Sequence, residues 1–380
     1  MKSVVYLDNS ATTRPCEAAI NNISSALVSE WGNPSSLHDM GFKAQLLVDN
    51  TRKTVATTLK CREDEIYFVG SGTEGNNTAI FGAAYSRQKR GKRIITTTIE
   101  HPSVLEPFKK LEGEGFEVIY LKPQENGAIS IDELKNAIDK NTILVSIMLV
   151  NNETGAIQPV KAASQIIKEV GAPALLHCDG VQAFGKMPIN LAEIGADLFT
   201  ASGHKIHGPK GIGILYVKKG VTIKPLIVGG GQEKNMRSGT ESVPLIYGLK
   251  GAIESLGNIQ EKLKAQKELW NYAKETLLDT GLITINSADD VLPYILNISV
   301  EGYRSETLLH FLEAQGVYVS SGSACAKGEG SYVLREMGLA RNRVDSALRI
   351  SFCRDNTRDD VDALKAAIIS ATQKLRRSTK

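Results

Sequence analysis

The stretch Ile143-Leu-Val-Ser-Ile-Met-Leu-Val150 decides the fold class. Seven of its eight residues are apolar, and no charged residue interrupts them. A strand that is apolar on both faces is typical of a parallel sheet that helices cover on both sides. We therefore expect a central strand at residues 142–150 of an α/β protein.

The same pattern extends in both directions from this strand. Further strands are predicted at residues 66–69, 93–97, 117–121, 174–178, 198–201 and 212–217. Amphipathic helices are predicted among them at residues 73–88, 103–114, 131–139 and 160–170. Strands that alternate with helices in this way form a mainly parallel sheet, here of seven strands, with helices on both faces.

The pattern changes near Gly239. A helical stretch is predicted from about residue 242 to 278, interrupted at Gly257. Strands then follow at residues 295–300, 317–320 and 348–351, and helices at residues 305–315 and 358–376. We predict a large domain of residues 16–257 and a smaller α+β domain of residues 1–15 with 258–380.

Composition excludes several classes of protein. The chain has 380 residues, 42% of them hydrophobic, and a net charge of +3. No apolar run approaches the roughly 18 residues that cross a membrane, and the N-terminal residues do not resemble a signal peptide. The single basic cluster, at residues 374–380, is more typical of a solvated helix end than of a nucleic-acid site. Five scattered cysteines without a CxxC pair predict a reducing, cytoplasmic environment.

Five predicted strands run directly into polar loops. Because ligands of parallel sheets bind outside the carboxyl ends of the strands, these loops should converge on one site. The loops are Gly70-Ser-Gly-Thr-Glu-Gly75, Glu100-His101, Asn151-Asn-Glu-Thr-Gly155, Asp179-Gly-Val-Gln182 and Ser202-Gly-His-Lys205. One such loop carries little weight, but five in succession predict a catalytic centre.

Three of these loops offer groups that suit a phosphorylated, cationic ring. The glycine-rich turn at residues 70–75 opens a helix and could bind phosphate, with Thr73 adding a hydroxyl, or could be a plain helix cap. Asp179 follows a buried strand and needs a cationic partner, which a protonated pyridine nitrogen or a structural ion pair would supply. His101 could stack on a flat ring and transfer protons, or serve only as a structural histidine.

Lys205 ends its strand in a partly desolvated position. Desolvation lowers the pKa of a lysine and makes its amine a Schiff-base nucleophile, although most lysines are simply solvated. A lysine, an aspartate and a phosphate loop at one sheet edge are the parts that hold pyridoxal phosphate. A P-loop is excluded because no GxxxxGK[ST] occurs. His204 and His207 could suggest a metal pair, but no cysteine or carboxylate cluster accompanies them in the sequence, so no metal is expected.

Cys325 lies in a segment rich in glycine and serine, residues 320–331. Such a segment predicts an exposed loop, and the thiol beside Lys327 is a candidate reactive nucleophile. Cys178 and Cys353 lie within apolar strands instead, and we expect them to be buried packing residues.

The motifs together resemble the cysteine desulfurase family of the NifS and IscS kind, within the class-V aminotransferases. The resemblance spans nearly the whole chain. It is carried by Tyr6-Leu-Asp-Asn-Ser-Ala-Thr-Thr13, Gly32-Asn-Pro-Ser-Ser-Leu-His38, Ser71-Gly-Thr-Glu-Gly-Asn-Asn77, Glu100-His-Pro-Ser-Val104, Val150-Asn-Asn-Glu-Thr-Gly155, Ser202-Gly-His-Lys-Ile-His-Gly-Pro-Lys-Gly211, Arg237-Ser-Gly-Thr-Glu241, Ser321-Gly-Ser-Ala-Cys325 and Leu348-Arg-Ile-Ser351. It implies fold type I of the pyridoxal-phosphate enzymes.

The resemblance also implies a role for each site residue. Lys205 would hold pyridoxal phosphate covalently, His101 would stack on its ring and shuttle protons, and Cys325 would accept the sulfur. The other implied cofactor contacts are Asp179 with the ring nitrogen, Gln182 with the ring hydroxyl, Gly72, Thr73, Ser202 and His204 with the phosphate, and Thr240 with the phosphate of a second subunit. Asn152, which also belongs to the cofactor site, and Arg349 would bind the substrate carboxylate.

The implied activity is removal of sulfur from L-cysteine, giving L-alanine and a persulfide for iron–sulfur cluster assembly or thio-modification. The implied partners are a second copy of the chain and a sulfur-acceptor protein, without direct contact to nucleic acid or membrane. Two alternatives remain open: another class-V enzyme, such as an aminotransferase or a selenocysteine lyase, and a non-catalytic scaffold. An aminotransferase needs no exposed thiol, and a scaffold needs neither Lys205 nor Asp179.

Overall fold

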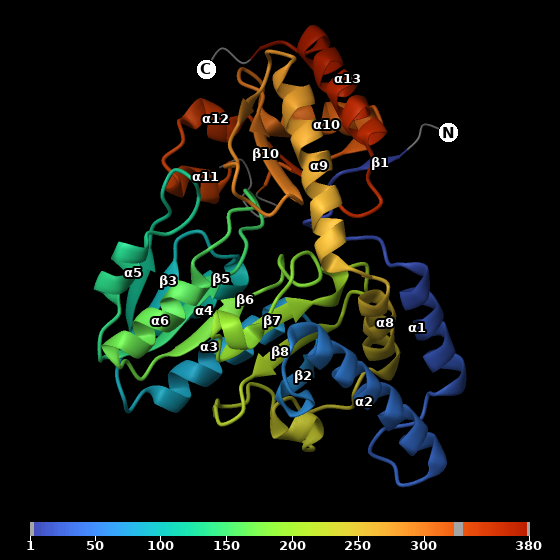
Figure 1. Cartoon of the computed structure of the whole chain (residues 1–380), viewed down its shortest axis with the longest axis vertical. Helices are drawn as coiled ribbons and strands as arrows, with labels where there is room; N and C mark the ends of the chain where they lie inside the picture. Colours follow the sequence, from blue (N-terminus) through green and yellow to red (C-terminus); the bar gives the residue numbers. More distant parts are fainter. Residues whose placement is uncertain (1–3, 323–329, 378–380) are drawn as a thin grey trace.

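One seven-stranded sheet forms the centre of the molecule (Figure 1). The structure is a computed structural model, and it describes residues 4–322 and 330–377. In spatial order the strands are β2 (Ile66–Val69), β8 (Gly213–Val217), β7 (Leu198–Ser202), β6 (Leu175–Asp179), β5 (Thr142–Met148), β3 (Arg93–Thr97) and β4 (Glu117–Leu121). β8 pairs antiparallel with both of its neighbours, whereas the other pairs are parallel. The predicted mainly parallel sheet is confirmed.

Helices cover both faces of this sheet. Adjacent strand residues such as Leu198 and Phe199 enter two different hydrophobic clusters, as the alternation of a strand requires. The cluster on one face includes α3 (Gly72–Arg87) and α4 (Pro102–Gly113). The cluster on the other face includes α1 (Glu17–Ser29), α2 (Asp39–Leu59), α5 (Ile131–Ala137), α6 (Val160–Val170), α7 (Leu191–Ile194) and α8 (Val243–Glu254).

The region at the top of Figure 1, near both ends of the chain, has a hydrophobic cluster of its own. Its strands are β12 (Ala347–Ser351), β10 (Ile295–Ser299) and β9 (Thr284–Ile285) in one antiparallel sheet, and β1 (Val5–Tyr6) parallel to β11 (Val317–Tyr318). The helices of this region are α9 (Ile259–Leu278), α10 (Ser305–Ala314), α11 (Tyr332–Glu336), α12 (Arg341–Asp345) and α13 (Arg358–Lys374). Val5 and Leu7 join this cluster, and we keep the division at residues 15 and 257 as a proposal.

The predicted break at Gly257 separates α8 from α9. Gly257 has φ +61°, a left-handed conformation that glycine adopts without strain. The Asn258 side chain then accepts hydrogen bonds from the backbone N–H groups of Gln260 and Glu261 and so caps α9.

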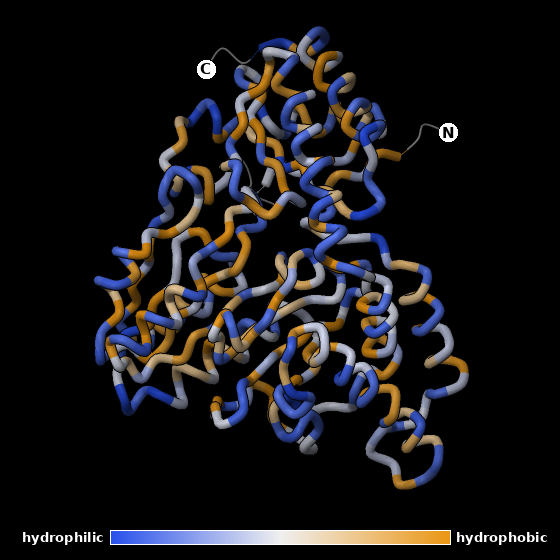
Figure 2. Tube along the Cα trace, viewed as in Figure 1, coloured by the Kyte–Doolittle hydropathy of each residue, from blue (hydrophilic) through white to orange (hydrophobic). Residues whose placement is uncertain are grey.

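Hydrophobic residues run through the strands and alternate with hydrophilic ones along the surrounding helices (Figure 2). Within residues 4–322 and 330–377, no helix combines the length and the apolar character needed to span a bilayer. The structure adds two long helices, α1 and α2, in a region where the sequence analysis assigned no element.

A buried ion pair joins α2 to the edge strand β2. Arg52 donates to Glu233 through Nη1 to Oε2 at 2.9 Å and Nη2 to Oε1 at 2.7 Å. Arg52 also donates to the carbonyl of Ile66, and Glu233 Oε2 accepts the backbone N–H of Phe68. The Arg52 side chain is 11% exposed and the Glu233 side chain is 3% exposed. If one of the two charges were removed, little water could reach the other to solvate it.

We predict that Glu233→Gln lowers the free energy of unfolding by about 3 kcal/mol, because it leaves the Arg52 guanidinium buried without a counter-charge. Urea denaturation followed by circular dichroism measures the change. Glu106→Gln is the control, since Glu106 forms an exposed pair with Lys109 and its loss should leave stability nearly unchanged. Equal effects of the two substitutions would contradict the prediction.

Candidate active site

A cavity of about 500 Å³ opens at the carboxyl ends of β5, β6 and β7. Ten of the twelve predicted site residues line it: Gly72, Thr73, His101, Asn152, Asp179, Gln182, Ser202, His204, Lys205 and Arg349. The convergence of the polar loops therefore takes place as the strand order requires.

Lys205 projects into the cavity from η2 (Gly203–Lys205), the turn that follows β7. Its Nζ donates to the backbone carbonyls of Ser10 at 2.5 Å and Ala11 at 2.8 Å. Burial lowers the pKa of Lys205 to about 8, and the nearby charge of Arg349 acts in the same direction. An appreciable fraction of the amine is therefore unprotonated near neutral pH, as a nucleophile requires.

Asp179 is the last residue of β6, and its carboxylate is held from two sides. Oδ2 accepts a hydrogen bond from Asn76 Nδ2 at 2.7 Å, and Oδ1 accepts one from the backbone N–H of Val181 at 2.9 Å. The next residue must be glycine, because a Cβ on Gly180 would lie 2.0 Å from the Phe199 ring. Asp179 is thus a fixed, buried carboxylate that lines the cavity.

His101 caps the N-terminus of α4 with its own ring. The backbone N–H of Ser103 donates to Nδ1 at 3.1 Å, so in the neutral ring the proton lies on Nε2. The His101 ring lines the cavity, and desolvation by the surrounding protein lowers its pKa. The charge of Asp179 opposes this shift, and the charge of Lys205 adds to it. The ring is therefore mainly neutral at physiological pH, and in that form it can accept a proton from a reacting group.

The opposite end of the cavity suits an anion. Gly72 and Thr73 form the first turn of α3, where backbone N–H groups point outward from the helix. Ser202 Oγ is buried there and has no hydrogen-bond partner among the described residues. The His204 ring lies beside it, bonded through Nδ1 to Thr12 Oγ1 at 3.2 Å. Burial lowers the pKa of His204 to about 4, so the ring is neutral at physiological pH.

Arg349 reaches the cavity from β12. Its Nη2 donates to Asp8 Oδ1 at 2.7 Å, and its Nη1 donates to the backbone carbonyl of Asn152 at 3.1 Å. Arg349 Nε and Asn152 Oδ1 are both buried, and neither has a partner within the described parts of the chain. The guanidinium is therefore held in place by Nη1 and Nη2 while its Nε–H donor stays unpaired, which suits a small carboxylate.

The sequence analysis gave no role to several residues that complete the site. Asn76 Nδ2 donates both to Asp179 and to Ser103 Oγ, and so joins the aspartate to the turn that carries His101. Glu153 also lines the cavity; burial raises the pKa of its carboxyl group, and it accepts a hydrogen bond from Ser331. All except Ser331 lie in the quoted motifs, but a motif alone does not show which member faces a cavity.

Two predicted residues stand apart from the others. Thr240 is exposed and lies outside the cavity of its own chain. Cys325 lies outside the described residues, although Gly322, shortly before it in the sequence, lines the cavity.

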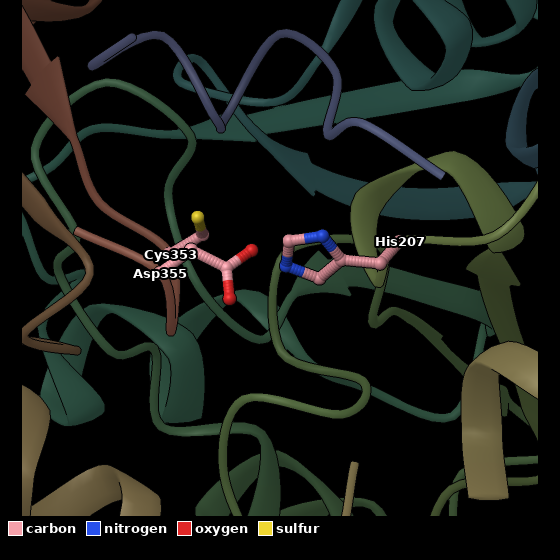
Figure 3. A group of neighbouring side chains, drawn as sticks. All are labelled: His207, Cys353 and Asp355. Carbon is pink, nitrogen blue, oxygen red and sulfur yellow. The ribbon is translucent and has the colours of Figure 1, made fainter. Parts of the chain in front are cut away.

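No cysteine or carboxylate cluster accompanies the paired histidines in the sequence, but the fold brings Cys353 and Asp355 to His207. The ligating atoms of His207, Cys353 and Asp355 lie within 4.8 Å of one another (Figure 3). Burial raises the pKa of the Cys353 thiol to about 11, so the thiolate that binds metals is disfavoured. Burial also lowers the pKa of His207, and Arg354 and Lys186 lower it further. These positive charges oppose a divalent cation, and we assign no metal to the group.

Comparison with known proteins agrees with this geometry. The family model described as aminotransferase class-V matches residues 5–364. The chain belongs to the class-V aminotransferase family. A relative from Methanosarcina thermophila named cysteine desulfurase IscS is 42% identical, over 98% of this chain and 93% of its own length.

Solved structures of this family share the fold. A structure titled NIFS-like protein superposes with a TM-score of 0.93 at 38% identity, covering 98% of this chain and all of that one. Another, titled SspA in complex with cysteine, gives a TM-score of 0.81 at 32% identity, over 91% of this chain and 98% of that one. The predicted fold type I of the pyridoxal-phosphate enzymes is confirmed.

We predict that a small amine reagent such as acetic anhydride, which reacts with the unprotonated amine, modifies Lys205 at a rate that levels off above about pH 8. Exposed lysines should continue to gain reactivity up to about pH 10, their ordinary titration range. Peptide mass spectrometry at several pH values follows each site, with the exposed Lys219 as internal control. Parallel pH profiles for Lys205 and Lys219 would show that the cavity does not perturb the amine.

Proposed function

We propose that the chain is a cysteine desulfurase, which uses pyridoxal phosphate to remove the sulfur atom of L-cysteine. The products are L-alanine and a persulfide on Cys325. The proposal rests chiefly on one observation: the Lys205 amine, with its lowered pKa, lies in the same cavity as the fixed Asp179 carboxylate and the His101 ring. The names of the relatives support the choice of substrate.

The residues present fit pyridoxal phosphate. Asp179 would pair with the protonated ring nitrogen, and His101 would stack on the ring. The buried, unpartnered Ser202 hydroxyl and the first turn of α3 would hold the phosphate together with His204. When bound, the cofactor would supply an electron sink for bonds broken at the α-carbon of the substrate.

The remaining residues would bind the cysteine substrate and transfer its protons. Arg349 Nε and the amide N–H group of Asn152 would donate to the substrate carboxylate, which would place the α-carbon beside Lys205. Lys205, as an unprotonated amine, would remove the α-proton, and His101 would move protons to and from the reacting atoms. The geometry thus gives each proton transfer a donor or acceptor within the cavity.

The net reaction balances without an external oxidant or reductant. The carbon–sulfur bond of cysteine breaks, and its β-carbon gains a proton and leaves as the methyl group of alanine. The sulfur atom forms a new bond to the Cys325 sulfur, which carries it as a persulfide until an acceptor thiol takes it. We propose a sulfur-acceptor protein for that step, in iron–sulfur cluster assembly or thio-modification.

We further propose a homodimer in which Thr240 of one copy reaches the phosphate bound by the other. Support comes from exposed apolar side chains on the segment that includes Thr240. Leu226 and Val228 are 44% and 78% exposed, and Ile227 bridges to Arg237 close to Thr240. Helices α1 and α2 and their connection add further exposed apolar residues, among them Trp31 and Phe42. Such a concentration is typical of a subunit interface.

Incubation with L-cysteine and a thiol reductant should give sulfide and alanine in equal amounts, and Cys325→Ala should abolish both. Mass spectrometry of the wild-type protein should find one added sulfur atom on the peptide that includes Cys325. Cys61→Ala is the control, because Cys61 lies outside the cavity and burial raises its pKa to about 12. Full turnover by Cys325→Ala would exclude Cys325 as the sulfur acceptor.

Asp179→Asn should weaken the binding of pyridoxal phosphate at least tenfold and reduce cysteine turnover more strongly, because an amide cannot pair with a cationic ring nitrogen. Titration of the cofactor-free protein, followed by visible absorbance, measures the affinity. Asp64→Asn removes an exposed carboxylate that pairs with Arg62 and should change neither quantity. Wild-type affinity in Asp179→Asn would rule out the ring-nitrogen contact.

A further inference from the structure

A lysine lies fully buried behind the cavity, and the proposed chemistry does not use it. Lys186 is 5% exposed and lies outside the cavity lining, four residues after Gln182. Its Nζ donates to Gln182 Oε1 at 2.9 Å. Burying an amine costs free energy unless hydrogen bonds replace those that it made to water. The hydrogen bond to Gln182 is such a replacement, and it ties Lys186 to a residue of the cavity.

The Gln182 amide links Lys186 to the reactive amine. Gln182 Nε2 donates to the backbone carbonyl of Ser10 at 3.0 Å. The same carbonyl accepts the Lys205 Nζ at 2.5 Å. A chain of three hydrogen bonds therefore runs from Lys186 through Gln182 and Ser10 to Lys205.

This chain fixes which way the Gln182 amide points. A backbone carbonyl only accepts hydrogen bonds, so the side of the amide that faces Ser10 must be the NH₂ group. Lys186, as a donor, matches the amide oxygen on the other side. Ser10 lines the cavity and Lys186 does not, which places the amide nitrogen on the cavity side and the oxygen on the buried side.

We propose that Lys186 is a positioning residue, which holds Gln182 with one N–H free to donate to the ring oxygen of bound pyridoxal phosphate. The inference rests on the proposed function and deepens it. Without Lys186, the hydrogen bond to the Ser10 carbonyl alone would orient the amide. The amide would then be held less firmly, and its N–H would point less well toward the ring oxygen.

Both protonation states of Lys186 support this role. Burial, with smaller contributions from the charges of Lys205 and Arg349, lowers its pKa to about 7, and Cys353 opposes this shift. The amine keeps N–H donors whether or not it is charged, so the hydrogen bond to Gln182 persists on either side of that pKa.

The chain offers a matched control. A second cavity, of about 20 Å³, is lined by both Lys186 and Lys262. Lys262 donates to the backbone carbonyl of Ser255 at 3.2 Å, and it makes no hydrogen bond to Gln182. Lys186→Met and Lys262→Met therefore remove the same group from the same cavity, and only the first disturbs the amide.

Cofactor-free protein is titrated with pyridoxal phosphate, and the dissociation constant and the pH midpoint of the visible band are recorded. We expect Lys186→Met to weaken binding about three- to tenfold, the effect of one lost hydrogen bond. The pH midpoint of the visible band should move to higher pH. Without the hydrogen bond from Gln182, the ring oxygen of the cofactor is more basic, so deprotonation of the bound cofactor needs a higher pH. Lys262→Met should match the wild type.

Two further comparisons separate positioning from a general structural effect. In a Gln182→Met background, Lys186→Met should add no further loss, because its effect passes through the amide. Lys186→Gln, which keeps an N–H donor and is available if Lys186→Met does not fold, should restore near wild-type behaviour. The proposal would be overturned if the losses of affinity from Gln182→Met and Lys186→Met were additive. It would also be overturned if Lys186→Gln bound the cofactor as weakly as Lys186→Met. A wild-type protein that binds no pyridoxal phosphate would instead contradict the proposed function itself.

Discussion

The register of three parallel strands is the constraint on which the site depends. Met148 of β5 pairs with Asp179 of β6, and Asp179 pairs with Thr200 of β7. Because the strands run side by side in one direction, the residues that follow them enter the same space. A register shift of one residue would turn Asp179 toward the opposite helical layer, where Cys178 now lies fully buried. The chemistry is therefore set by backbone pairing before any side chain is considered.

Lys205, Asp179 and His101 could be predicted from the sequence because each follows a recognisable strand at once. The contact between Asp8 and Arg349 could not, since 341 residues separate them and neither residue type is unusual. Helix α1 was missed for a different reason. Its buried residues are only Ala19 and Ala26, while Leu27 and Val28 are exposed, so its apolar residues do not trace a single buried stripe.

The cavity is closed on one side by the region that contains β10 and β12, at the top of Figure 1. Arg349 brings a guanidinium from β12 to Asp8 and to the loop after β5. On the same loop, Glu153 accepts the hydroxyl of Ser331, which caps α11. Beside these polar contacts, Ile99 packs against Val333 and Leu334 of α11 in a small hydrophobic cluster. The seam between the two regions thus combines charge and hydrogen bonding at the cavity with hydrophobic packing next to it.

The carbonyl of Ser10 receives both the Lys205 amine and the Gln182 amide, and it belongs to the backbone. No side-chain substitution removes a backbone oxygen. In an alanine scan of the cavity, Ser10→Ala would remove only the hydroxyl group. It would leave in place the backbone carbonyl that accepts hydrogen bonds from Lys205 and Gln182. At Ser10 the N-terminal segment, which contributes a two-residue strand to the fold, therefore acts through the path of its backbone, whereas at Asp8 it acts through a side chain. Homologous chains are therefore expected to keep the backbone conformation at residue 10 even where another small residue fills its buried position.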